Sequence, residues 1–558
     1  MTSSLLHPGI ILILFGLFIP LIKNRLIVLL FPIASFIILF SLDNGTIIKL
    51  DYGNYELILL SIDKLSRLFS YIFLLILFAT AIFSINQDNK SEISSAFVYV
   101  GSSISVVLSG DLITLFIFWE IMAITSTVVI WSGSKQSYYP GIRYLAVHLL
   151  GGSILLIGII GYANTTGTLT FGLMSPDNIF SYFVLAGFLI NAGAPPFSSW
   201  IPDAYPSASW SGTVFLSAFT TKTAVYVLIV GYAGYQFLIY VGIFMIFYGI
   251  IFAILENDMR RILSYSIVNQ VGFMIVAVGI GTEIAINGAS SHAFTHIIYK
   301  ALLLMSAGSV FYITGRTKCT DLGGLYKTMP LTMICGIIGA LSISAFPLTS
   351  GFISKSLTVQ ATVYEELKIL WLLLTMASAG VFLHAGIKFP WFVFFQKDAK
   401  IKAEDPPKNM RLAMILLSAL CILIGVFPGA LYSILPYDVK YIPYTLDHVS
   451  SQLQLLMFSG LAFFILLKYL KRTLTITLDF DWFWRKFGVL VVNLFDTYLL
   501  KKTQTLIQSI DNLGTQTIRS LHKYNGPSGM LGRSWSTGSM ALWTAILLGL
   551  FLLFYLFA

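Results

Sequence analysis

Titratable residues within long apolar segments are the part of this sequence that could do chemistry. Glu120 lies in the middle of ITLFIFWEIMAITS, and Lys222 lies in the middle of SAFTTKTAVYVL. Ionisable side chains at bilayer depth are costly and are functional candidates by default. Because desolvation disfavours the charged form of an acid or an amine, both groups could exchange protons near neutral pH. A structural ion pair for Glu120 and snorkelling of Lys222 to an interface are the alternatives.

The segment HAFTHIIYKALL places His292, His296 and Lys300 at positions i, i+4 and i+8, on one face of a helix. Histidine titrates near neutral pH and offers two ring nitrogens, so this face is suited to proton hopping. Structural hydrogen bonding is the main alternative. A metal site is disfavoured, because no third soft ligand or carboxylate lies nearby. The pattern therefore predicts a proton relay on this helix.

Two further lysines lie deep in apolar segments. Lys355 follows a break in FPLTSGFISKS, where the end of a half-helix would expose unpaired backbone groups beside its amine. Lys388 lies in FLHAGIKFPWF, with His384 one turn earlier. His148, in YLAVHLLGG, could join the same network, and a packing role fits its surroundings equally well. We expect the two lysines to extend the row of buried titratable groups.

The composition makes the bilayer the solvent of this chain. Of its 558 residues, 57% are hydrophobic and only 11% are charged, whereas soluble domains carry roughly 25% charged residues. The formal net charge of +9 then reflects basic cytoplasmic loops and not nucleic-acid binding. The three cysteines show no metal-ligand spacing, and the sequence has no nucleotide, haem or iron–sulfur motif. We therefore expect no cofactor and no metal.

Apolar runs of about 20 residues predict an all-α polytopic membrane protein with about 14–16 transmembrane helices. The first run has no basic segment before it and no cleavage site, so we interpret it as a retained span. The predicted spans cover residues 5–22, 26–41, 66–85, 94–109, 112–132, 144–162, 180–200, 212–234, 238–255, 262–281, 287–313, 331–362, 369–394, 411–435, 452–470 and 539–557.

The loop charges predict an orientation. With the N-terminus outside, Lys49, Lys64, Lys368 and Lys440 are the basic residues of the outside loops, and the inside loops hold far more. An excess of Lys and Arg in cytoplasmic loops is the usual pattern of membrane proteins. We therefore expect a multi-pass protein of the cell (inner) membrane with its N-terminus outside.

Two predicted spans contain helix breakers at depth, in GAPPFSSWIPDAYP (193–206) and AFPLTSGFISK (345–355). In lipid, irregular backbone persists only where it faces protein or a water-filled cavity. Paired interrupted helices are typical of inverted-repeat transporters. Spans four to eight and nine to thirteen would form two inverted five-helix repeats, each with a broken helix. Two ordinary proline kinks are the alternative.

Residues 478–537 differ from the rest of the chain. The segment begins with LDFDWFWRKFG, and Gly526 and Pro527 end its helical pattern. Apolar side chains recur at roughly helical spacing at Phe483, Phe487, Leu490, Leu494, Tyr498, Leu506, Ile510, Leu513 and Leu521. We expect an amphipathic helix along the inner membrane surface, with a solvated linker as the alternative.

The motifs follow a fixed order over roughly residues 60–395: IFWEIMAITS, PPFSSWIPDAYP, SAFTTKTAVYVL, ENDMRRILSYSIVNQVGF, HAFTHIIYKALL and FPLTSGFISKS. In these motifs the chain resembles the antiporter-like subunits of respiratory complex I and of Mrp-type multi-subunit Na⁺/H⁺ antiporters, most of all the Mrp D-type subunit. The resemblance implies proton-pathway roles for Glu120, Lys222, His292, His296, Lys300 and Lys355.

One position departs from the family pattern. Most members carry a lysine on the seventh span, nine residues before the tryptophan that is Trp200 here, and this chain has Asn191 instead. In the family that lysine pairs with the carboxylate of the fifth span, so Glu120 lacks its usual partner. We expect Glu120 either to be partly protonated or to pair with Lys222. The first half-channel is then gated differently or weakened.

Spans and resemblance together predict five regions. They are an N-terminal three-helix segment (1–90), a first antiporter-like repeat (91–260), a second repeat (261–396), C-terminal transmembrane helices (397–475), and the amphipathic helix with a terminal span (476–558).

The leading functional hypothesis is a membrane subunit of a multi-subunit cation/proton antiporter, which conducts protons along the buried titratable residues and water. Its partners would be other hydrophobic subunits, the bilayer, protons and monovalent cations, without nucleic acid. One alternative is a proton-pumping subunit of an NADH-quinone oxidoreductase or related redox-driven complex, whose redox centres lie elsewhere. Another is a non-transporting scaffold. The hypothesis favours a transporter subunit over an enzyme.

Overall fold

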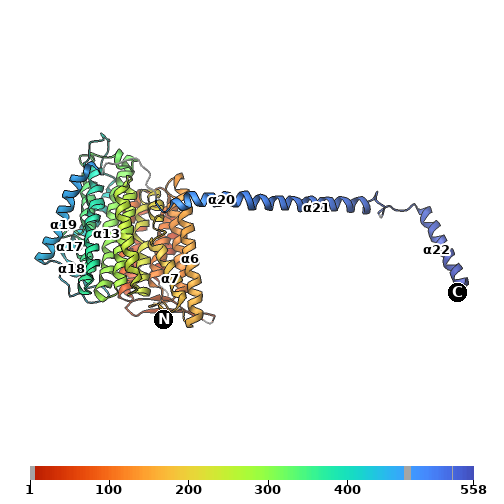
Figure 1. Cartoon of the computed structure of the whole chain (residues 1–558), viewed down its shortest axis with the longest axis horizontal. Coiled ribbons are helices and arrows are strands. Elements are labelled where there is room, and N and C mark those ends of the chain that lie inside the picture. The colour runs from red at the N-terminus through yellow and green to blue at the C-terminus, as the bar shows by residue number, and fades with distance from the viewer. Residues whose placement is uncertain (1–6, 54, 470–478, 531, 558) are drawn as a thin grey trace. The chain divides into compact units, whose positions relative to one another are not determined.

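The first of two units in the chain, ending at Phe480, is a bundle of membrane helices with one small hairpin (Figure 1). The computed structural model describes residues 7–53, 55–469, 479–530 and 532–557. The N-terminal part of the unit contains α1 (Pro8–Phe18), α2 (Leu30–Ser41), β1 (Ile47–Tyr52), β2 (Tyr55–Ser61), α3 (Lys64–Phe83), α4 (Lys90–Leu108), α5 (Leu112–Trp131) and α6 (Tyr138–Thr166). The middle part contains α7 (Ile179–Ala192), α8 (Trp200–Ala204), α9 (Gly212–Ala218), α10 (Thr220–Tyr232), α11 (Phe237–Leu255), α12 (Met259–Ile280) and α13 (Glu283–Thr314). The last part contains α14 (Pro330–Ile343), α15 (Ser350–Tyr364), α16 (Lys368–Val381), α17 (Lys408–Val426), α18 (Pro428–Tyr432) and α19 (Leu446–Ile465).

The helices fall on the predicted spans. Within the described residues, 12 helices are long and apolar enough to cross a membrane, and shorter apolar helices cover Pro8–Leu21, Arg25–Ser41, Ile179–Ala192 and Pro330–Ile343. The prediction of an all-α polytopic membrane protein is confirmed. In the described part of the chain, the antiparallel hairpin of β1 and β2 is an element that apolar periodicity did not predict.

Aspartates at helix N-termini set where several spans begin. Asp63 forms a reciprocal capping box with Ser66 at the start of α3, and Asp258 accepts hydrogen bonds from the first backbone amides of α12. Asp111 caps α5 and also accepts a hydrogen bond from the Ile58 amide of β2, at 2.7 Å. These carboxylates satisfy backbone donors that have no partner within the helix. Asp63 therefore has a structural role at the start of its span.

Three spans are interrupted, and two of the interruptions were predicted. The seventh span stops at Ala192, where Gly193 has φ +76°, and the backbone resumes as α8. The twelfth divides into α14 and α15, with Ala345 (φ +56°) and Leu348 (φ +68°) in left-handed conformations between them. These breaks confirm the prediction. The eighth span is also divided, into α9 and α10, although it contains neither proline nor a glycine at the break.

The centre of the unit is α12, which is buried along its entire length and packs against α10, α11 and α13. Its contact with α11 depends on glycine. A Cβ on Gly249 of α11 would lie 2.6 Å from the Tyr265 carbonyl oxygen, and one on Gly242 would lie 2.7 Å from the Gly272 carbonyl oxygen. Small residues at such positions let membrane helices approach closely. The polar side chains of α12 are thereby held within the protein and away from lipid.

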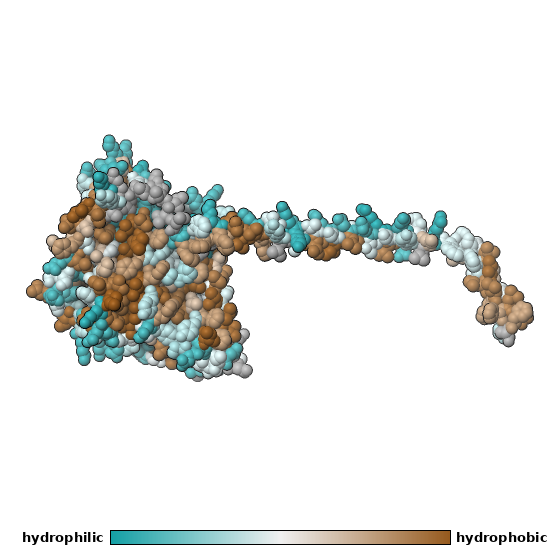
Figure 2. All heavy atoms as spheres, in the orientation of Figure 1, coloured by the Kyte–Doolittle hydropathy of each residue, from teal (hydrophilic) through white to brown (hydrophobic). Residues whose placement is uncertain are grey.

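The second unit, from Asp481 onward, contains α20 (Val489–Phe495), α21 (Lys501–Asn525) and α22 (Thr537–Phe557). The predicted helix is present and ends at Asn525, immediately before Gly526 and Pro527. Hydrophilic and hydrophobic residues of α21 gather on opposite faces (Figure 2). Leu478, the first residue of the predicted segment, lies outside the described residues. The terminal span coincides with α22.

Candidate proton and cation pathway

Glu120 and Asn191 approach a pair of glycines on α6. The Glu120 carboxylate lies so close to Gly152 that a Cβ there would clash with Oε1, and a Cβ on Gly151 would be 3.6 Å from Asn191 Oδ1. The amide oxygen and nitrogen of Asn191 and Oε1 of Glu120 are buried, and none of them has a hydrogen-bond partner among the described residues. Buried polar atoms in proteins are normally satisfied by protein or by water. Water is therefore the partner expected for these atoms, which lie where α5 and α7 contact α6.

His148 lies one turn from this glycine pair and faces an aromatic cluster. Its Nδ1 is 2.9 Å from the Tyr144 carbonyl oxygen, and its ring stacks on that of Tyr144 with centroids 3.9 Å apart. Trp200 meets the His148 ring edge to face at 4.6 Å, and its indole nitrogen donates to the Ile190 carbonyl. His148 Nε2 is buried and has no partner within the described part of the chain. His148 Nδ1 is therefore bonded to the backbone of its own helix, and Nε2 is the nitrogen that water could bind.

A line of hydroxyl groups leads from α6 toward α10. Together with the buried titratable residues, it forms what we call the polar row. Ser126 and Tyr144 form a hydrogen bond of 2.8 Å between their hydroxyls, and the Tyr144 hydroxyl is 3.4 Å from Thr220 Oγ1. Thr220 Oγ1 is also 2.6 Å from the hydroxyl of Tyr99 on α4. Each of these hydroxyls can both donate and accept a hydrogen bond, so this line of hydroxyl groups can pass a proton in either direction.

Lys222 is fully buried at the unpredicted break between α9 and α10. Its Nζ donates to the Ser217 carbonyl oxygen at 2.6 Å and to Thr221 Oγ1 at 3.0 Å. Ser217 belongs to the last turn of α9, where backbone carbonyls lack an intrahelical donor and carry partial negative charge. The helix break therefore supplies an acceptor for the ammonium group without a carboxylate. The structure gives no ion pair between Lys222 and Glu120.

Gln270 of α12 joins the next titratable residues. Its Oε1 is 3.1 Å from His292 Nε2 and 3.2 Å from the hydroxyl of Tyr299, and its Nε2 donates to Asn269 Oδ1 at 2.5 Å. Asn269 in turn lies 3.0 Å from His384 Nε2. A continuous hydrogen-bonded line thus crosses from α13 through α12 to His384, which lies in the π-helical segment after α16.

His296 and Lys300 lie beside this line on α13. Lys300 Nζ donates to Ser266 Oγ of α12 at 2.7 Å. His296 is fully buried, its ring centroid is 5.3 Å from that of Tyr299, and neither of its nitrogens has a partner among the residues that the structure describes. The charges of Lys222 and Lys300 both act on its imidazole. The imidazole of His296 is therefore within the electrostatic influence of both lysines.

Lys355 is on the first turns of α15, after the broken segment. Its Nζ donates to the carbonyl oxygen of Ile343, the last residue of α14, at 3.0 Å and lies 5.0 Å from the centre of the Phe273 ring. The preceding residue, Ser354, is 3.3 Å from His292 Nδ1. The amine of Lys355 thus binds an unpaired carbonyl at the end of a half-helix, as the sequence predicted, and its neighbour Ser354 contacts His292.

Lys388 has different surroundings. It ends the π-helical segment Phe382–Lys388, and its Nζ donates to the carbonyl oxygens of Ala253, Ile254 and Glu256 at 2.6, 2.7 and 2.7 Å. These carbonyls are at the C-terminal end of α11. Lysine at that position satisfies orphan carbonyls and the helix dipole. Lys388 therefore caps α11, while His384 of the same segment makes the link to Asn269.

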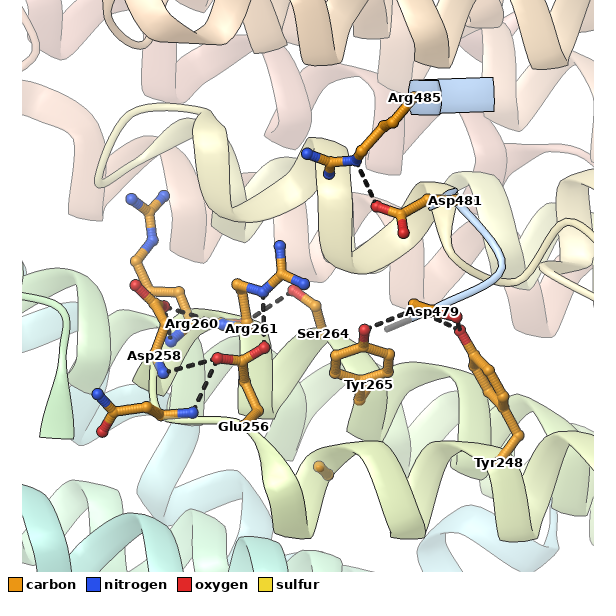
Figure 3. Close-up of polar contacts among 12 residues, drawn as sticks. Tyr248, Glu256, Asp258, Arg260, Arg261, Ser264, Tyr265, Asp479, Asp481 and Arg485 are labelled. Atoms are coloured by element: carbon orange, nitrogen blue, oxygen red, sulfur yellow. Dashed lines mark hydrogen bonds and ion pairs between the residues drawn. The ribbon is translucent and has the colours of Figure 1, made fainter. Parts of the chain in front are cut away.

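The loop between α11 and α12 carries a charged pair next to this cap (Figure 3). Arg261 Nε donates to Glu256 Oε2 at 2.8 Å, and Glu256 Oε1 accepts from the amides of Asn257 and Asp258. Burial alone would raise the pKa of Glu256, but the Arg261 guanidinium and these hydrogen bonds hold that pKa below its ordinary value. Figure 3 also shows Asp479 accepting hydrogen bonds from the hydroxyls of Tyr248 and Tyr265. The loop between α11 and α12 is thus held by an ion pair and by hydrogen bonds.

The structure brings most of the predicted residues into one polar row across α5, α6, α7, α10, α12, α13 and α15. Sequence reasoning missed its connecting groups, of which the main ones are Tyr99, Tyr144, Thr220, Ser266, Asn269, Gln270, Tyr299 and Ser354. The signal for the α12 members was present, because LSYSIVNQVGF alternates polar residues within an apolar span. Among the described residues, no group of three or more His, Cys, Asp and Glu side chains could hold a metal ion.

A known protein family matches the middle of the chain. The family described as "NADH:quinone oxidoreductase/Mrp antiporter, TM" matches residues 109–382, which contain the interrupted helices and most of the polar row. Residues 109–382 belong to this family. The resemblance drawn from the sequence motifs is thereby confirmed.

Curated relatives and solved structures agree with the family. The chain is 29% identical over 341 residues to the D-type subunit of the Na⁺/H⁺ antiporter of Alkalihalophilus pseudofirmus, covering 57% of this chain and 69% of that protein. It is 28% identical over 497 residues to the A1 subunit of the Na⁺/H⁺ antiporter of Staphylococcus haemolyticus, covering 77% of this chain and 62% of that longer protein. The chain thus spans less than two thirds of the A1 relative.

Two solved complexes share the fold. The Mrp complex from Dietzia sp. DQ12-45-1b matches with a TM-score of 0.69 and 20% identity, over 78% of this chain and 96% of the matched chain. The membrane-bound sulfane sulfur reductase, an archaeal respiratory membrane complex, matches with a TM-score of 0.71 and 22% identity, over 98% and 100%. The chain is therefore a multi-pass membrane protein with the antiporter-like fold.

Gln270 offers a direct test of the hydrogen-bonded line. We expect Gln270→Leu to lower the free energy of unfolding by about 1–3 kcal/mol, because it leaves His292, Tyr299 and Asn269 with unsatisfied buried groups. The measurement is the thermal unfolding midpoint of the purified protein in detergent. Gln360→Leu, at a partly exposed position of α15, is the matched control. Equal midpoints for the two variants would contradict the role assigned to Gln270.

Proposed function

We propose that the chain is a membrane subunit of a multi-subunit Na⁺/H⁺ antiporter and conducts protons along its buried polar row. The observation that carries this proposal is the line of titratable and hydroxyl groups that crosses the interior of the antiporter-like fold. Buried ionisable residues in membrane spans mark ion and proton pathways. A scaffold that only anchored other subunits would gain nothing from three fully enclosed lysines and two adjacent histidines.

Protons move in this account between neighbouring groups through water. Glu120 exchanges protons with water held near Asn191 and His148. Hydroxyl groups connect this water to Thr220, which lies beside Lys222. Lys222 passes protons to His296, and the relay continues through Lys300 and His292 to Lys355. Each step moves one proton. An ammonium or imidazolium donor becomes neutral, the Glu120 carboxylic acid becomes a carboxylate, and the accepting amine or imidazole becomes charged.

Electrostatic repulsion couples these steps. Two unit charges about 4 Å apart interact by roughly 4 kcal/mol at an effective dielectric constant near 20. The amines of Lys222, Lys300 and Lys355 all act on the histidine face of α13. Protonation of one residue therefore lowers the proton affinity of the next. This repulsion drives protons along the row. In an antiporter, this repulsion would be balanced by movement of a monovalent cation in the opposite sense.

Asn191 changes the first half of the pathway. Because it carries no charge, Glu120 has no cationic partner on α7, and its carboxylate faces the Gly151–Gly152 surface of α6. We propose that Glu120 is partly protonated in this setting, and that water bound to the Asn191 amide replaces the lysine of other members. Asn191 is then a water-binding residue of the pathway and not a proton carrier. Lys388, which caps α11, lies at the edge of the pathway and would fix the position of His384.

The orientation and regional division predicted from the sequence form part of the proposal. We place the N-terminus outside and the basic loops, including residues 256–261, inside. The two repeats would cover residues 91–260 and 261–396, which contain the interrupted seventh and twelfth spans respectively. The segment 476–558 would lie along the inner membrane surface before its last helix crosses the bilayer.

A second candidate function is a proton-pumping subunit of a redox-driven membrane complex. The fold match to the sulfane sulfur reductase complex covers 98% of this chain, more than the match to the Mrp complex covers. The chemistry within this chain would be the same in both assemblies. Its redox centres would belong to other subunits, and the chain would be part of an enzyme without being catalytic itself.

Substitutions of Lys222 test the proposed proton conduction. We expect Lys222→Ala and Lys222→Arg each to lower cation-driven proton flux by about tenfold or more, because neither side chain takes up and releases a proton at this site. The flux is measured with a pH-sensitive dye in everted vesicles that contain the assembled complex. Lys327→Ala, at an exposed position, is the control. Wild-type flux in both Lys222 variants would refute the proposal.

Copurification separates the two candidate functions. We expect affinity purification of the intact complex to yield small hydrophobic subunits without flavin or iron–sulfur proteins. Mass spectrometry and the visible absorption spectrum of the sample provide the measurement. Stoichiometric iron–sulfur subunits would instead assign the chain to a redox-driven complex.

A further inference from the structure

A buried carboxylate lies outside the row described above. Glu92 is fully buried in the first turn of α4, and its Oε1 accepts hydrogen bonds from Ser211 Oγ at 2.5 Å and Ser209 Oγ at 2.7 Å. Its Oε2 accepts from Gln87 Nε2 at 3.2 Å. Gln87 and Ser209 are partly exposed. The carboxylate therefore has polar neighbours that reach the surface formed by the loops before α4 and before α9.

Arg260 places a fixed positive charge near Glu92 without forming an ion pair with it. Its guanidinium donates to the carbonyl oxygens of Ala208 and Ser209 and to the hydroxyl of Thr213, and it lies 4.9 Å from the centre of the Phe311 ring. Its charge acts on the Glu92 carboxylate. Arginine does not release its proton. Arg260 thus makes the surroundings of Glu92 repulsive to a second cation.

Two helices lead from Glu92 to Lys222. On α9 and the turn before it, Ser209, Thr213 and Ser217 are four residues apart and share one face, and the Thr213 hydroxyl donates to the Ser209 carbonyl oxygen at 3.0 Å. The carbonyl of Ser217 binds Lys222. Both Thr213 and Ser217 are buried. This face carries a polar group at every turn between the carboxylate and the amine.

The second wall of this route is α4. Glu92 and Tyr99 are seven residues apart, so they lie on one face of the helix and about 10 Å apart along its axis. Tyr99 binds Thr220, two residues before Lys222. Because α4 packs against both α9 and α10, the same face joins the Glu92 end of the route to the lysine end.

We infer that Glu92 is a proton-uptake site that feeds Lys222 directly from the membrane surface bearing residues 87–89 and 205–211. This inference rests on the proposed proton conduction by Lys222. Glu92 takes a proton from water beside Gln87 and Ser209 and becomes neutral. The proton then passes through hydroxyls and water to the neutral amine of Lys222, and Glu92 returns to the carboxylate. Arg260 keeps Na⁺ out of this branch, so the branch carries protons only.

The test uses the assembled complex in everted vesicles. We expect Glu92→Gln to lower proton flux by about tenfold with an unchanged yield of complex, because glutamine can still accept the serine hydrogen bonds but cannot carry the proton. Asp177→Asn is the matched control, since Asp177 is an exposed carboxylate in the loop before α7, outside the proposed uptake surface. Glu92→Asp should retain part of the flux with an altered pH profile.

Three results separate the role of Glu92 from the proposed proton conduction by Lys222. Wild-type flux in Glu92→Gln, with Lys222→Ala inactive, overturns the role of Glu92 and leaves the proposed function intact. Wild-type flux in Lys222→Ala overturns the proposed function itself. If Glu92→Gln prevents assembly, Glu92→Asp decides: a reduced flux with a changed pH profile supports the uptake site, and an unchanged flux and profile overturn it.

Discussion

Burying a positive charge in a membrane protein requires a compensating acceptor, and this chain supplies backbone carbonyls. Lys222 binds the last turn of α9, Lys355 binds the last residue of α14, and Lys388 binds the C-terminal end of α11. Helix C-termini offer unpaired carbonyls and the negative end of the helix dipole. The interruptions in the eighth and twelfth spans therefore supply the acceptors of Lys222 and Lys355.

This solution also suits proton transfer. A carboxylate partner would stabilise the charged ammonium strongly, whereas a carbonyl or hydroxyl stabilises it less and leaves the neutral amine acceptable. The carbonyl partners of Lys222 and Lys355 and the hydroxyl partner of Lys300 follow this rule. Two partly buried ion pairs, Arg143 with Asp203 and Arg261 with Glu256, lie near helix ends.

The sequence predicts most of the fold because apolar run length reports directly on spans. It also predicts the breaks at 193–206 and 345–355, since glycine and proline mark them. It does not predict the break before Lys222, where the sequence SAFTTKT contains no breaker and tertiary contacts, such as the Tyr99 hydroxyl accepting from the Thr220 amide, determine the backbone. Glu92 was missed for a related reason. It stands at the edge of a span, where a carboxylate usually faces water, and only the packing of Ser209 and Ser211 buries it.

The central claim is that water connects four of the residues with buried polar atoms that have no partner among the described residues. These atoms are Glu120 Oε1, His148 Nε2, the amide atoms of Asn191 and the ring nitrogens of His296. The most direct measurement is a cryo-electron microscopy map of the intact complex at a resolution that reveals ordered water. The account predicts water within hydrogen-bond distance of each of these four side chains. Dry, closely packed apolar surroundings at Glu120 and His296 would contradict it.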